Sequence, residues 1–308
     1  MMTLTFQELD DLENNIKLLV NDNELLQRKT SQDLVYQCIR YLENGSLRVA
    51  SPKGEGPNCG EVEMRELSEW EVHPWVKQAI LVAMKMRTPE SFKWELTGNL
   101  KNTAQGRVHA GVLGYHDKLD VRKDLAAFGV RSVYGSIVRE GAYVSKGAIL
   151  MPSFVNIGAW VGLGTMIDTW ATAGSCAQIG KNVHVAGGVG IGGVLEPENA
   201  KPVMIGDNAF LGSRVIVVEG TVVSEGAILA ANVSLTSSTP IYDVTNAEKK
   251  EYRGFVPPNA VVVAGTRVKS FPGGEVPIQC AYIIAYRSGK SDSKVSLNNI
   301  LRETGIPI

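Results

Sequence analysis

The sequence predicts a mainly β protein, in which a left-handed parallel β-helix follows an N-terminal helical domain and a small α/β connector. An apolar side chain recurs at every sixth residue from Ile137 to Ile191, and a second run in a shifted frame extends from Ile205 to Leu235. A six-residue period matches neither an α-helix nor a heptad, but it is typical of a hexapeptide β-helix. In that fold three hexapeptides close one triangular coil of about 18 residues. The first run comprises Ile137, Tyr143, Ile149, Val155, Val161, Ile167, Ala173, Ile179, Val185 and Ile191.

Small residues support the same prediction, because only small groups fit near the crowded corners of such a coil. A hexapeptide cannot bury its apolar face alone, so stability is expected to come from stacking successive coils. The small residues that follow four positions after an apolar one are Gly141, Gly147, Ser153, Ala159, Thr165, Ala171 and Ala177.

The part of the chain before the repeat reads as helical. Leu12, Ile16 and Leu19 mark one face of a first helix. A second helix is predicted in DLVYQCIRYLENG, where Gly45 provides a C-terminal stop. SLRVAS then predicts a short strand, and SPKGEGPNCGEVE a loop. A third helix is predicted in WEVHPWVKQAILVAMKMR, opened by Pro74.

Two polar stretches, GGVLEPENAKPV and PIYDVTNAEKKEYRGFVP, interrupt the repeat, and we expect them to form walls and a lid for a site. The six-residue step returns at Val256, Val262 and Val268. The tail contains the apolar segment CAYIIAY and a predicted final helix, SLNNILRE. The predicted domains are residues 1–87 (N-terminal helical domain), 88–130 (connector), 131–268 (β-helix with loop excursions) and 269–308 (C-terminal tail).

Composition narrows the functional class. The net charge is -1, which does not favour a nucleic acid or a membrane surface as partner. No apolar stretch is long enough for a membrane helix, and the acidic start does not resemble a signal peptide. Four cysteines lie far apart without a CxxC pair, which is typical of a reducing compartment. We therefore expect a cytoplasmic protein.

A β-helix is a platform for several functions, so three hypotheses compete. The first is an acyltransferase that binds coenzyme A along the seam between trimer subunits. The second is a zinc enzyme of the carbonic anhydrase type, which needs three histidines on the coils. Of the histidines, only His184 falls within the predicted coils, so no metal site is expected. The third is a non-catalytic trimeric scaffold.

The segment MPSFVNIGAWVGLGTMIDTWATAGSCAQIGKNVHVAGGVGIGGVLEP resembles the core of the tetrahydrodipicolinate N-succinyltransferase family of hexapeptide-repeat acyltransferases. The resemblance extends through VREGAYVSKGAILMPS, IGDNAFLGSRVIVVEG, YLENGSLRVA and HPWVKQAILVAMKMR. It implies transfer of a succinyl group from succinyl-CoA to the amino group of acyclic, hydrated tetrahydrodipicolinate, in lysine and diaminopimelate biosynthesis. It implies a homotrimer with sites at the subunit seams and succinyl-CoA as cosubstrate, with no permanently bound cofactor.

The family pattern implies that Arg131 and Asp168 contact the acceptor. A guanidinium suits a dicarboxylate, and Asp168 is the candidate base for the attacking amine. Glu219 is a second candidate catalytic carboxylate, expected to meet Asp168 across the trimer seam. Trp170 is a candidate wall of the acceptor pocket. From spacing alone, Asp168 and Glu219 could equally be turn carboxylates, and Arg131 a solvated charge.

The glycines Gly187, Gly188 and Gly190 are candidates to stabilise the oxyanion or to let the pantetheine arm approach closely. Arg214 and Lys269 are candidate contacts for the substrate and for coenzyme A. A buried structural thiol is favoured for Cys176 and a structural role is at least as plausible as a base for His184. Spacing leaves open an acetyl-CoA-dependent enzyme acting on the same or a related acceptor.

Overall fold

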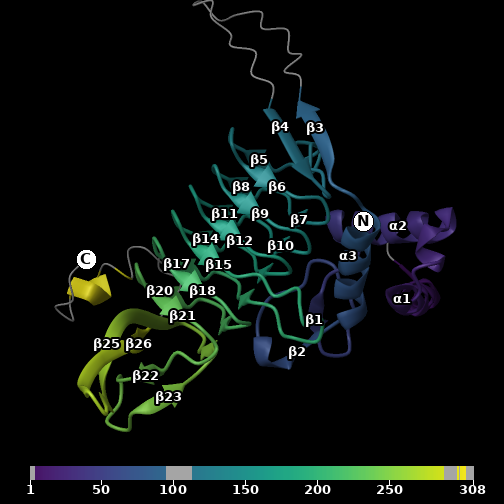
Figure 1. Ribbon diagram of the computed structural model, residues 1–308. Coiled ribbons are helices and arrows are strands. Elements are labelled where there is room, and N and C mark those ends of the chain that lie inside the picture. Colours follow the sequence, from purple (N-terminus) through teal and green to yellow (C-terminus); the bar gives the residue numbers. More distant parts are fainter. Residues whose placement is uncertain (1–3, 95–112, 288–296, 298, 303–308) are drawn as a thin grey trace, which may run out of the picture.

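The computed structural model describes residues 4–94, 113–287, 297 and 299–302. A group of helices lies at one end, a stack of short parallel strands forms the body, and long strands lie at the other end (Figure 1). Among the described residues, no helix is both long enough and apolar enough to cross a bilayer. Part of the connector, including His109, part of the tail and part of SLNNILRE lie outside the described residues.

The helical part forms as the sequence predicts. Thr5 caps the first helix, and Glu8 completes a capping box with it. Gly45 follows the second helix with φ +77°, and Pro74 opens the third. The helices pack together through their buried apolar faces. They are α1 (Phe6–Asn21), η1 (Leu25–Gln27), α2 (Lys29–Glu43), η2 (Leu67–Glu69) and α3 (Pro74–Met86).

Two short antiparallel pairs accompany the helices. β1 (Ala50–Pro52) pairs with β2 (Trp70–Val72) and closes the loop predicted from its glycines and prolines. β3 (Glu90–Trp94) pairs with β4 (Leu113–Asp117) in the connector. The described part of the connector contains these strands and turns but no helix.

The body is a prism of three parallel ladders, because each short strand pairs with the equivalent strand in the coil before it and in the coil after it. The β5 ladder contains β5 (Arg131–Ser132), β8 (Ile149–Leu150), β11 (Met166–Ile167), β14 (His184–Val185), β17 (Phe210–Leu211), β20 (Ile228–Leu229) and β25 (Ala260–Phe271). The β6 ladder contains β6 (Ile137–Val138), β9 (Phe154–Val155), β12 (Thr172–Ala173), β15 (Gly190–Ile191), β18 (Ile216–Val217) and β21 (Ser234–Leu235). The β7 ladder contains β7 (Tyr143–Val144), β10 (Trp160–Val161), β13 (Gln178–Ile179), β16 (Met204–Ile205), β19 (Val222–Val223) and β24 (Phe255–Val256). This is a parallel β-helix.

The second residue of each two-residue strand points into the prism. In the first coil the predicted inward residues are therefore wrong by one position. Ile137 is 43% exposed, and Tyr143 and Ile149 also face outward. The corner between β8 and β9 is one residue shorter than its neighbours, so the strict six-residue step fails there. The inward residues of this first part are Val138, Val144 and Leu150; from Val155 to Leu235 the predicted residues are buried.

The helical part covers the β7 ladder. Tyr143 and Trp160 on its outer face are buried and pack against each other, with ring centroids 4.1 Å apart and planes tilted by 40°. Ile80 of α3 reaches the corner at Gly158, where an added Cβ would lie 2.8 Å from its Cδ1. The β5 and β6 ladders therefore keep outer faces that the helices do not cover.

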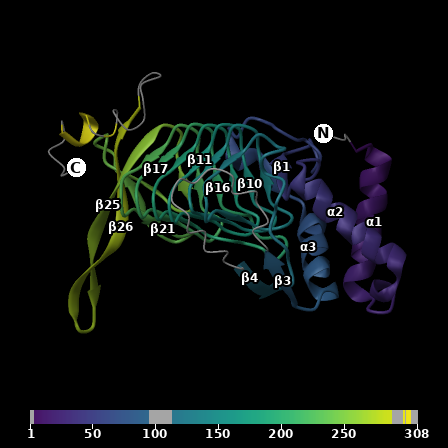
Figure 2. The ribbon, with the colours of Figure 1, turned by 90° about the horizontal axis from the view of Figure 1, so that it is seen from above.

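The coils end in long strands that leave the prism (Figure 2). Val256 and Val262 are buried as predicted, but the prediction for Val268 is wrong: it is 64% exposed on the projecting hairpin of β25 and β26 (Gly274–Tyr286). β22 (Ile241–Asp243) pairs with β23 (Lys250–Tyr252) and with β26. β26 buries Cys280 and Ile283, so the first part of the tail after residue 270 belongs to the core.

Candidate active site

The edge of the prism between the β5 and β6 ladders gathers most of the predicted site residues. The Gly188 N–H donates to the Thr169 carbonyl at 2.8 Å. In the next coil the Arg214 N–H donates to the Gly187 carbonyl at 3.1 Å. Neighbouring coils are about 4.8 Å apart. Trp170, Gly188 and Arg214 therefore occupy equivalent corners of three successive coils.

Arg131 and Asp168 face outward from the same ladder. Arg131 is exposed, begins β5 and pairs with Ile149, which pairs in turn with Met166. Asp168 follows the inward-pointing Ile167, and alternation along the strand turns it outward. The two backbones are separated by two strand spacings, roughly 10 Å. A long guanidinium side chain and a carboxylate can thus approach one small ligand from two coils that have one coil between them.

Asp168 is a half-buried carboxylate that one neighbour orients. Its Oδ1 accepts hydrogen bonds from the Thr169 N–H at 2.6 Å and from the Thr169 hydroxyl at 3.2 Å. No described residue donates a hydrogen bond to its Oδ2. The corner therefore holds the carboxylate by one oxygen and leaves the other able to accept a proton.

The three predicted glycines differ in what they can offer a ligand. The N–H groups of Gly188 and Gly190 are engaged in the coil, with Gly190 donating to Val215 at 2.8 Å. The Gly187 N–H makes no hydrogen bond within the described part of the chain. A Cβ at Gly190 would lie 2.7 Å from Cδ1 of Ile216, so that glycine has a packing reason. Of the three, only Gly187 can donate to an oxyanion.

Gly188 is shaped by Arg214. It has φ +69°, and an added Cβ would lie 2.5 Å from the Arg214 Nη1. The guanidinium therefore lies directly over the Gly188 backbone. Arg214 is itself exposed, in the left-handed region with φ +63°. This places a positive charge one coil from Gly187 and two coils from Asp168.

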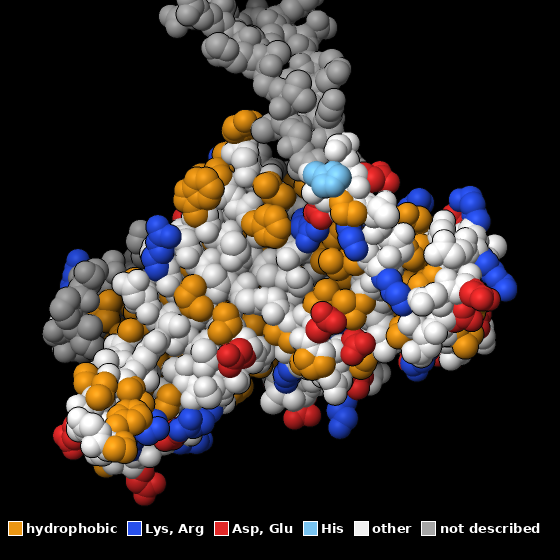
Figure 3. Space-filling model, viewed as in Figure 1, with side chains coloured by type: hydrophobic (Ala, Val, Ile, Leu, Met, Phe, Trp, Pro, Cys, Tyr) orange, Lys and Arg blue, Asp and Glu red, His pale blue; other side chains and the backbone are white. Residues whose placement is uncertain are grey.

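Large apolar side chains are exposed along the same edge. Trp170 has φ +60° and is 72% exposed, and Tyr134, at the corner two coils before it, is 82% exposed. Ile216 on the β6 ladder is 37% exposed. Figure 3 shows hydrophobic side chains recurring over this side of the prism. Exposed rings gathered along one edge are typical of a site for a ligand or a partner.

Glu219 does not lie at this edge. It occupies the corner after β18, between the β6 and β7 ladders, with φ +55°. Its carboxylate accepts hydrogen bonds from the Ser237 hydroxyl at 2.8 Å and the Ser237 N–H at 3.3 Å. Within one chain, Glu219 and Asp168 are therefore on different edges of the prism.

Lys269 also lies away from the other predicted residues. It is exposed on the projecting hairpin, opposite Val276, and its ammonium lies 5.2 Å from the ring centroid of Phe271. Nine residues separate it from Ala260, where β25 begins, which corresponds to roughly 30 Å of extended strand. The structure does not bring Lys269 to the glycines of the same chain.

Two residues at this edge, Thr169 and Tyr134, are not among the predicted site residues. Thr169 could have been found, because a threonine next to an aspartate at a turn commonly donates to it. Tyr134 could not, because it precedes the first inward residue of the predicted run, and its exposure depends on where the first coil closes. The fold decides that feature.

Comparisons with known proteins agree with these features. A family model described as "Tetrahydrodipicolinate N-succinyltransferase N-terminal" matches residues 11–86, and one described as "Hexapeptide repeat of succinyl-transferase" matches residues 202–237. A 2,3,4,5-tetrahydropyridine-2,6-dicarboxylate N-succinyltransferase of Dechloromonas aromatica (strain RCB) is 42% identical over 274 residues, covering 87% of this chain and 89% of that protein. The chain belongs to this family.

Other members of the tetrahydropyridine-dicarboxylate N-succinyltransferase family match almost end to end. The protein of that name from Bartonella bacilliformis is 38% identical over 310 residues, covering 96% of this chain and 99% of its own length. A solved chain from Campylobacter jejuni overlaps 82% of this chain and 62% of its own, at 16% identity and a TM-score of 0.47. Family membership makes the chain an acyltransferase.

In this N-succinyltransferase family member, Cys176 and His184 both have surroundings that fit a structural role. Burial raises the pKa of the Cys176 thiol to about 12, so it stays protonated and is a poor nucleophile. Its side chain packs beneath the helices with Ile157. His184 stacks on Phe210, with ring centroids 5.0 Å apart and planes 8° apart. Both observations favour the structural interpretations.

Proposed function

We propose that this protein transfers the succinyl group of succinyl-CoA to the amino group of acyclic, hydrated tetrahydrodipicolinate. The products are N-succinyl-2-amino-6-oxopimelate and coenzyme A, in lysine and diaminopimelate biosynthesis. The observation that carries the proposal is the outward placement of Arg131 and Asp168 on one ladder, in a chain whose relatives bear that name. Succinyl-CoA is the cosubstrate.

In the proposed reaction, Arg131 binds a carboxylate of the acceptor through paired hydrogen bonds. The free Oδ2 of Asp168 accepts a proton from the attacking amine as its nitrogen bonds to the thioester carbonyl carbon. The Gly187 N–H donates to the resulting oxyanion. Collapse of that intermediate breaks the carbon–sulfur bond, and the proton passes to the coenzyme A thiolate.

The remaining candidates act on substrate binding. Trp170 forms a wall for the acceptor, and Arg214, lying over Gly188, binds an acidic group of the donor. Lys269 contributes to coenzyme A binding only if its hairpin reaches a neighbouring subunit. We retain Glu219 as a second carboxylate under the same condition.

Lys269 and Glu219 would reach a neighbouring subunit in a homotrimer of left-handed coils with its active sites at the subunit seams. The uncovered β6 ladder and the edge that it shares with the β5 ladder, with exposed Tyr134, Trp170 and Ile216, support such an assembly. In a rotational trimer one edge of a subunit meets a different edge of its neighbour. Glu219 of one subunit can thus approach Asp168 of the next. The hexapeptide repeat and the short two-residue strands support the left-handed coil.

A thiol-release assay with succinyl-CoA and tetrahydrodipicolinate tests the function. We expect Asp168→Asn to lower kcat by about 100-fold or more, because proton removal is lost. Arg131→Ala should mainly raise the KM for tetrahydrodipicolinate. Asp10→Asn and Arg65→Ala, both exposed and outside the site, are matched controls and should leave both constants unchanged. Full activity of Asp168→Asn would remove that residue from the chemistry.

Replacing the donor by acetyl-CoA in the same assay addresses the alternative donor. Turnover with acetyl-CoA equal to that with succinyl-CoA would contradict the proposed donor. Binding of neither thioester, measured as the absence of any shift in melting temperature, would instead support a scaffold.

A further inference from the structure

The proposed acceptor carries two carboxylates, but Arg131 supplies a charged partner for only one of them. Asp168 faces the amine, and a second carboxylate beside it would be repelled. Arg214 lies over Gly188 and is assigned to the donor. The other acceptor carboxylate therefore needs a hydrogen-bond donor from a further residue near the same edge of the prism.

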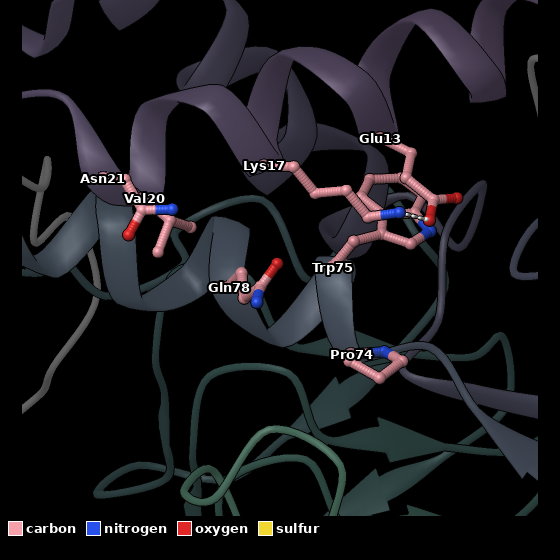
Figure 4. Close-up of a pocket in the computed structure, with 7 residues that line it drawn as sticks. All are labelled: Glu13, Lys17, Val20, Asn21, Pro74, Trp75 and Gln78. Carbon is pink, nitrogen blue, oxygen red and sulfur yellow. Dashed lines mark ion pairs between the residues drawn. The ribbon is translucent and has the colours of Figure 1, made fainter.

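The helical part of the chain is poorly placed to supply this donor. Its helices pack over the β7 ladder, while Asp168 faces outward from the β5 ladder. In the crevice between α1 and α3, the ammonium of Lys17 is already paired with the carboxylate of Glu13 (Figure 4). Among the described residues of one subunit, the candidates therefore belong to the prism.

Tyr134 occupies the corner that follows β5, three residues after Arg131 on the same coil. Trp170 occupies the equivalent corner two coils later, and Pro152 lies on the corner between them. The Trp170 N–H donates to the Pro152 carbonyl at 2.7 Å, and a Cβ added at Gly135 would lie 3.5 Å from the Cβ of Pro152. The strands before these corners, β5, β8 and β11, are neighbours in one ladder (Figure 1).

The polar groups of the two exposed rings are unused within the described part of the chain. Neither the Tyr134 hydroxyl nor the Trp170 indole N–H makes a hydrogen bond with a described residue, and both side chains are exposed. The other hydroxyls of these corners are occupied, since Thr169 donates to Asp168 and Ser136 donates to backbone carbonyls. A phenol hydroxyl donates readily to a carboxylate, and such a charge-assisted hydrogen bond is stronger than a neutral one.

The spacing suits an acceptor that lies along the first coil. Arg131 and Tyr134 are three residues apart, which corresponds to roughly 10 Å of extended strand. Arg131 pairs with Ile149, which pairs with Met166, so Asp168 lies level with the backbone between Arg131 and Tyr134, two coils away. A dicarboxylate held at its two ends by Arg131 and Tyr134 can thus turn its amine toward Asp168.

We propose that Tyr134 determines specificity for a dicarboxylate acceptor, by donating its hydroxyl to the carboxylate that Arg131 does not bind. Its ring and that of Trp170 then enclose the carbon chain of the acceptor. Contact of one chain with both rings needs ring planes roughly 7–8 Å apart, and two strand spacings separate the corner backbones by roughly 10 Å. The inference rests on the proposed function and adds a residue that selects the acceptor.

Kinetics of thiol release by the full-length protein test the inference. Tyr134→Phe removes the hydroxyl and keeps the ring, so we expect the KM for tetrahydrodipicolinate to rise roughly tenfold, with kcat and the KM for succinyl-CoA unchanged. Tyr134→Ala also removes the ring and should raise the acceptor KM further. Tyr41→Phe is the matched control, because the Tyr41 hydroxyl accepts from Gln37 at 2.6 Å on α2, and it should change none of these constants.

Two monocarboxylate competitors assign the hydrogen bond to one carboxylate. 6-Aminohexanoate lacks the carboxylate beside the amine, and 2-aminoheptanoate lacks the distal one. We expect Tyr134→Phe to weaken inhibition by only one of the two compounds, roughly tenfold, and Arg131→Ala to weaken inhibition by only the other.

The outcomes separate this inference from the function on which it rests. No thiol release by the natural protein would overturn both. With the natural protein active, an unchanged acceptor KM in Tyr134→Phe would overturn the role of Tyr134 alone, as would equal weakening of both competitors. A change in the sedimentation mass of Tyr134→Phe would also overturn it, because it would show that the hydroxyl acts in subunit packing.

Discussion

The corner at Asp168 shows how backbone geometry orients individual side chains. Thr169 holds one carboxylate oxygen with two hydrogen bonds, and Trp170 adopts φ +60°, which directs its ring out of the prism. Arg214 repeats the left-handed conformation two coils further on. Such conformations cost free energy and are kept where the surroundings enforce them. Here the stacked corners enforce them.

Substituting Gly188 should affect the donor rather than the fold. In Gly188→Ala, the new Cβ meets the Arg214 guanidinium, and we expect the KM for succinyl-CoA to rise roughly tenfold with little change in kcat. The backbone strain of alanine at positive φ adds about 1 kcal/mol of instability.

Gly54→Ala provides the matched control, since Gly54 also has positive φ but has nothing within 4 Å of the added Cβ. It should lower the melting temperature by a similar amount and leave the KM unchanged. The same KM change in both variants would show that strain, and not displacement of Arg214, is responsible.

His73 should make stability depend on pH. Burial lowers its pKa below the usual range for histidine, although Glu71 and Glu13 act in the opposite direction. Its Nε2 lies 2.7 Å from the Ser51 hydroxyl. The unfolded chain therefore takes up a proton at a higher pH than the folded chain, and stability falls as the pH drops through the unfolded pKa.

We expect the melting temperature to fall more for the natural protein than for His73→Gln between about pH 7.5 and about pH 5.5. Glutamine can keep a hydrogen bond to Ser51 but does not titrate. Parallel melting curves for the two proteins over this range would contradict the assignment.

The loop between β1 and β2 is held to the prism by Arg48, which is buried between two tryptophans. Its guanidinium carbon lies 4.0 Å from the ring centroid of Trp160 and 4.8 Å from that of Trp70. It donates to the Gln178 side chain at 3.1 Å and to the Gly60 carbonyl at 3.2 Å. A loop that reads as irregular in sequence is thus an ordered connection between the helical part and the β7 ladder.

Replacing Arg48 should therefore destabilise the protein. Arg48→Met leaves the acceptors on Gln178 and Gly60 buried without donors, and we expect the free energy of unfolding to fall by about 3 kcal/mol. Arg65→Met, in the same loop but exposed, should change it by no more than about 0.5 kcal/mol. Denaturant titration measures both. Equal effects would mean that the loop does not depend on Arg48.

The projecting hairpin combines two elements with different roles. Near the prism, β26 pairs with β25 and β22 and buries Cys280 and Ile283. Further out, Val268 and Phe271 are exposed. Removing the chain after Ser270 would therefore uncover the core as well as the outer arm, so it would report on folding before it reported on a lid.

The three ladders of the prism are covered to different extents. The helical part buries the outer face of the β7 ladder, and the last strands of the β5 ladder are buried at Phe210 and Ile228. The β6 ladder exposes Ile137 and Ile216, and the corner between the β5 and β6 ladders exposes the ring of Trp170. Because the net charge of the chain is only -1, electrostatic repulsion between two copies of the chain does little to keep these faces apart. The proposed trimer covers them.

We expect sedimentation to give a mass about three times the 33.3 kDa of one chain. Ile216→Asp should shift the protein toward monomers, because it places a charge in the proposed seam. Leu18→Asp, at an exposed apolar residue of α1, is the control and should leave the mass unchanged. A monomeric natural protein would contradict the trimer and the seam sites.

The period of the apolar residues was sufficient to predict a hexapeptide coil, because an inward position must be apolar in every strand that stacks. The same local information predicted α1, α2 and α3, because the apolar face of each helix lies within a single segment. The motif around Asp168 gave the family. It did not give the first coil, because a corner shortened by one residue moves every earlier side chain to the other face.

Tertiary structure decided which edge each candidate occupies. Residues 51 positions apart, Asp168 and Glu219, looked equivalent as turn carboxylates, yet stacking places them on different edges. It also separated Gly187, with an available N–H, from Gly188 and Gly190, whose N–H groups are used by the coil. Sequence period fixes which residues turn inward, because burial is a local requirement. Which residues of different coils lie on the same edge depends on the length of every corner between them. Those lengths are set only when the chain folds.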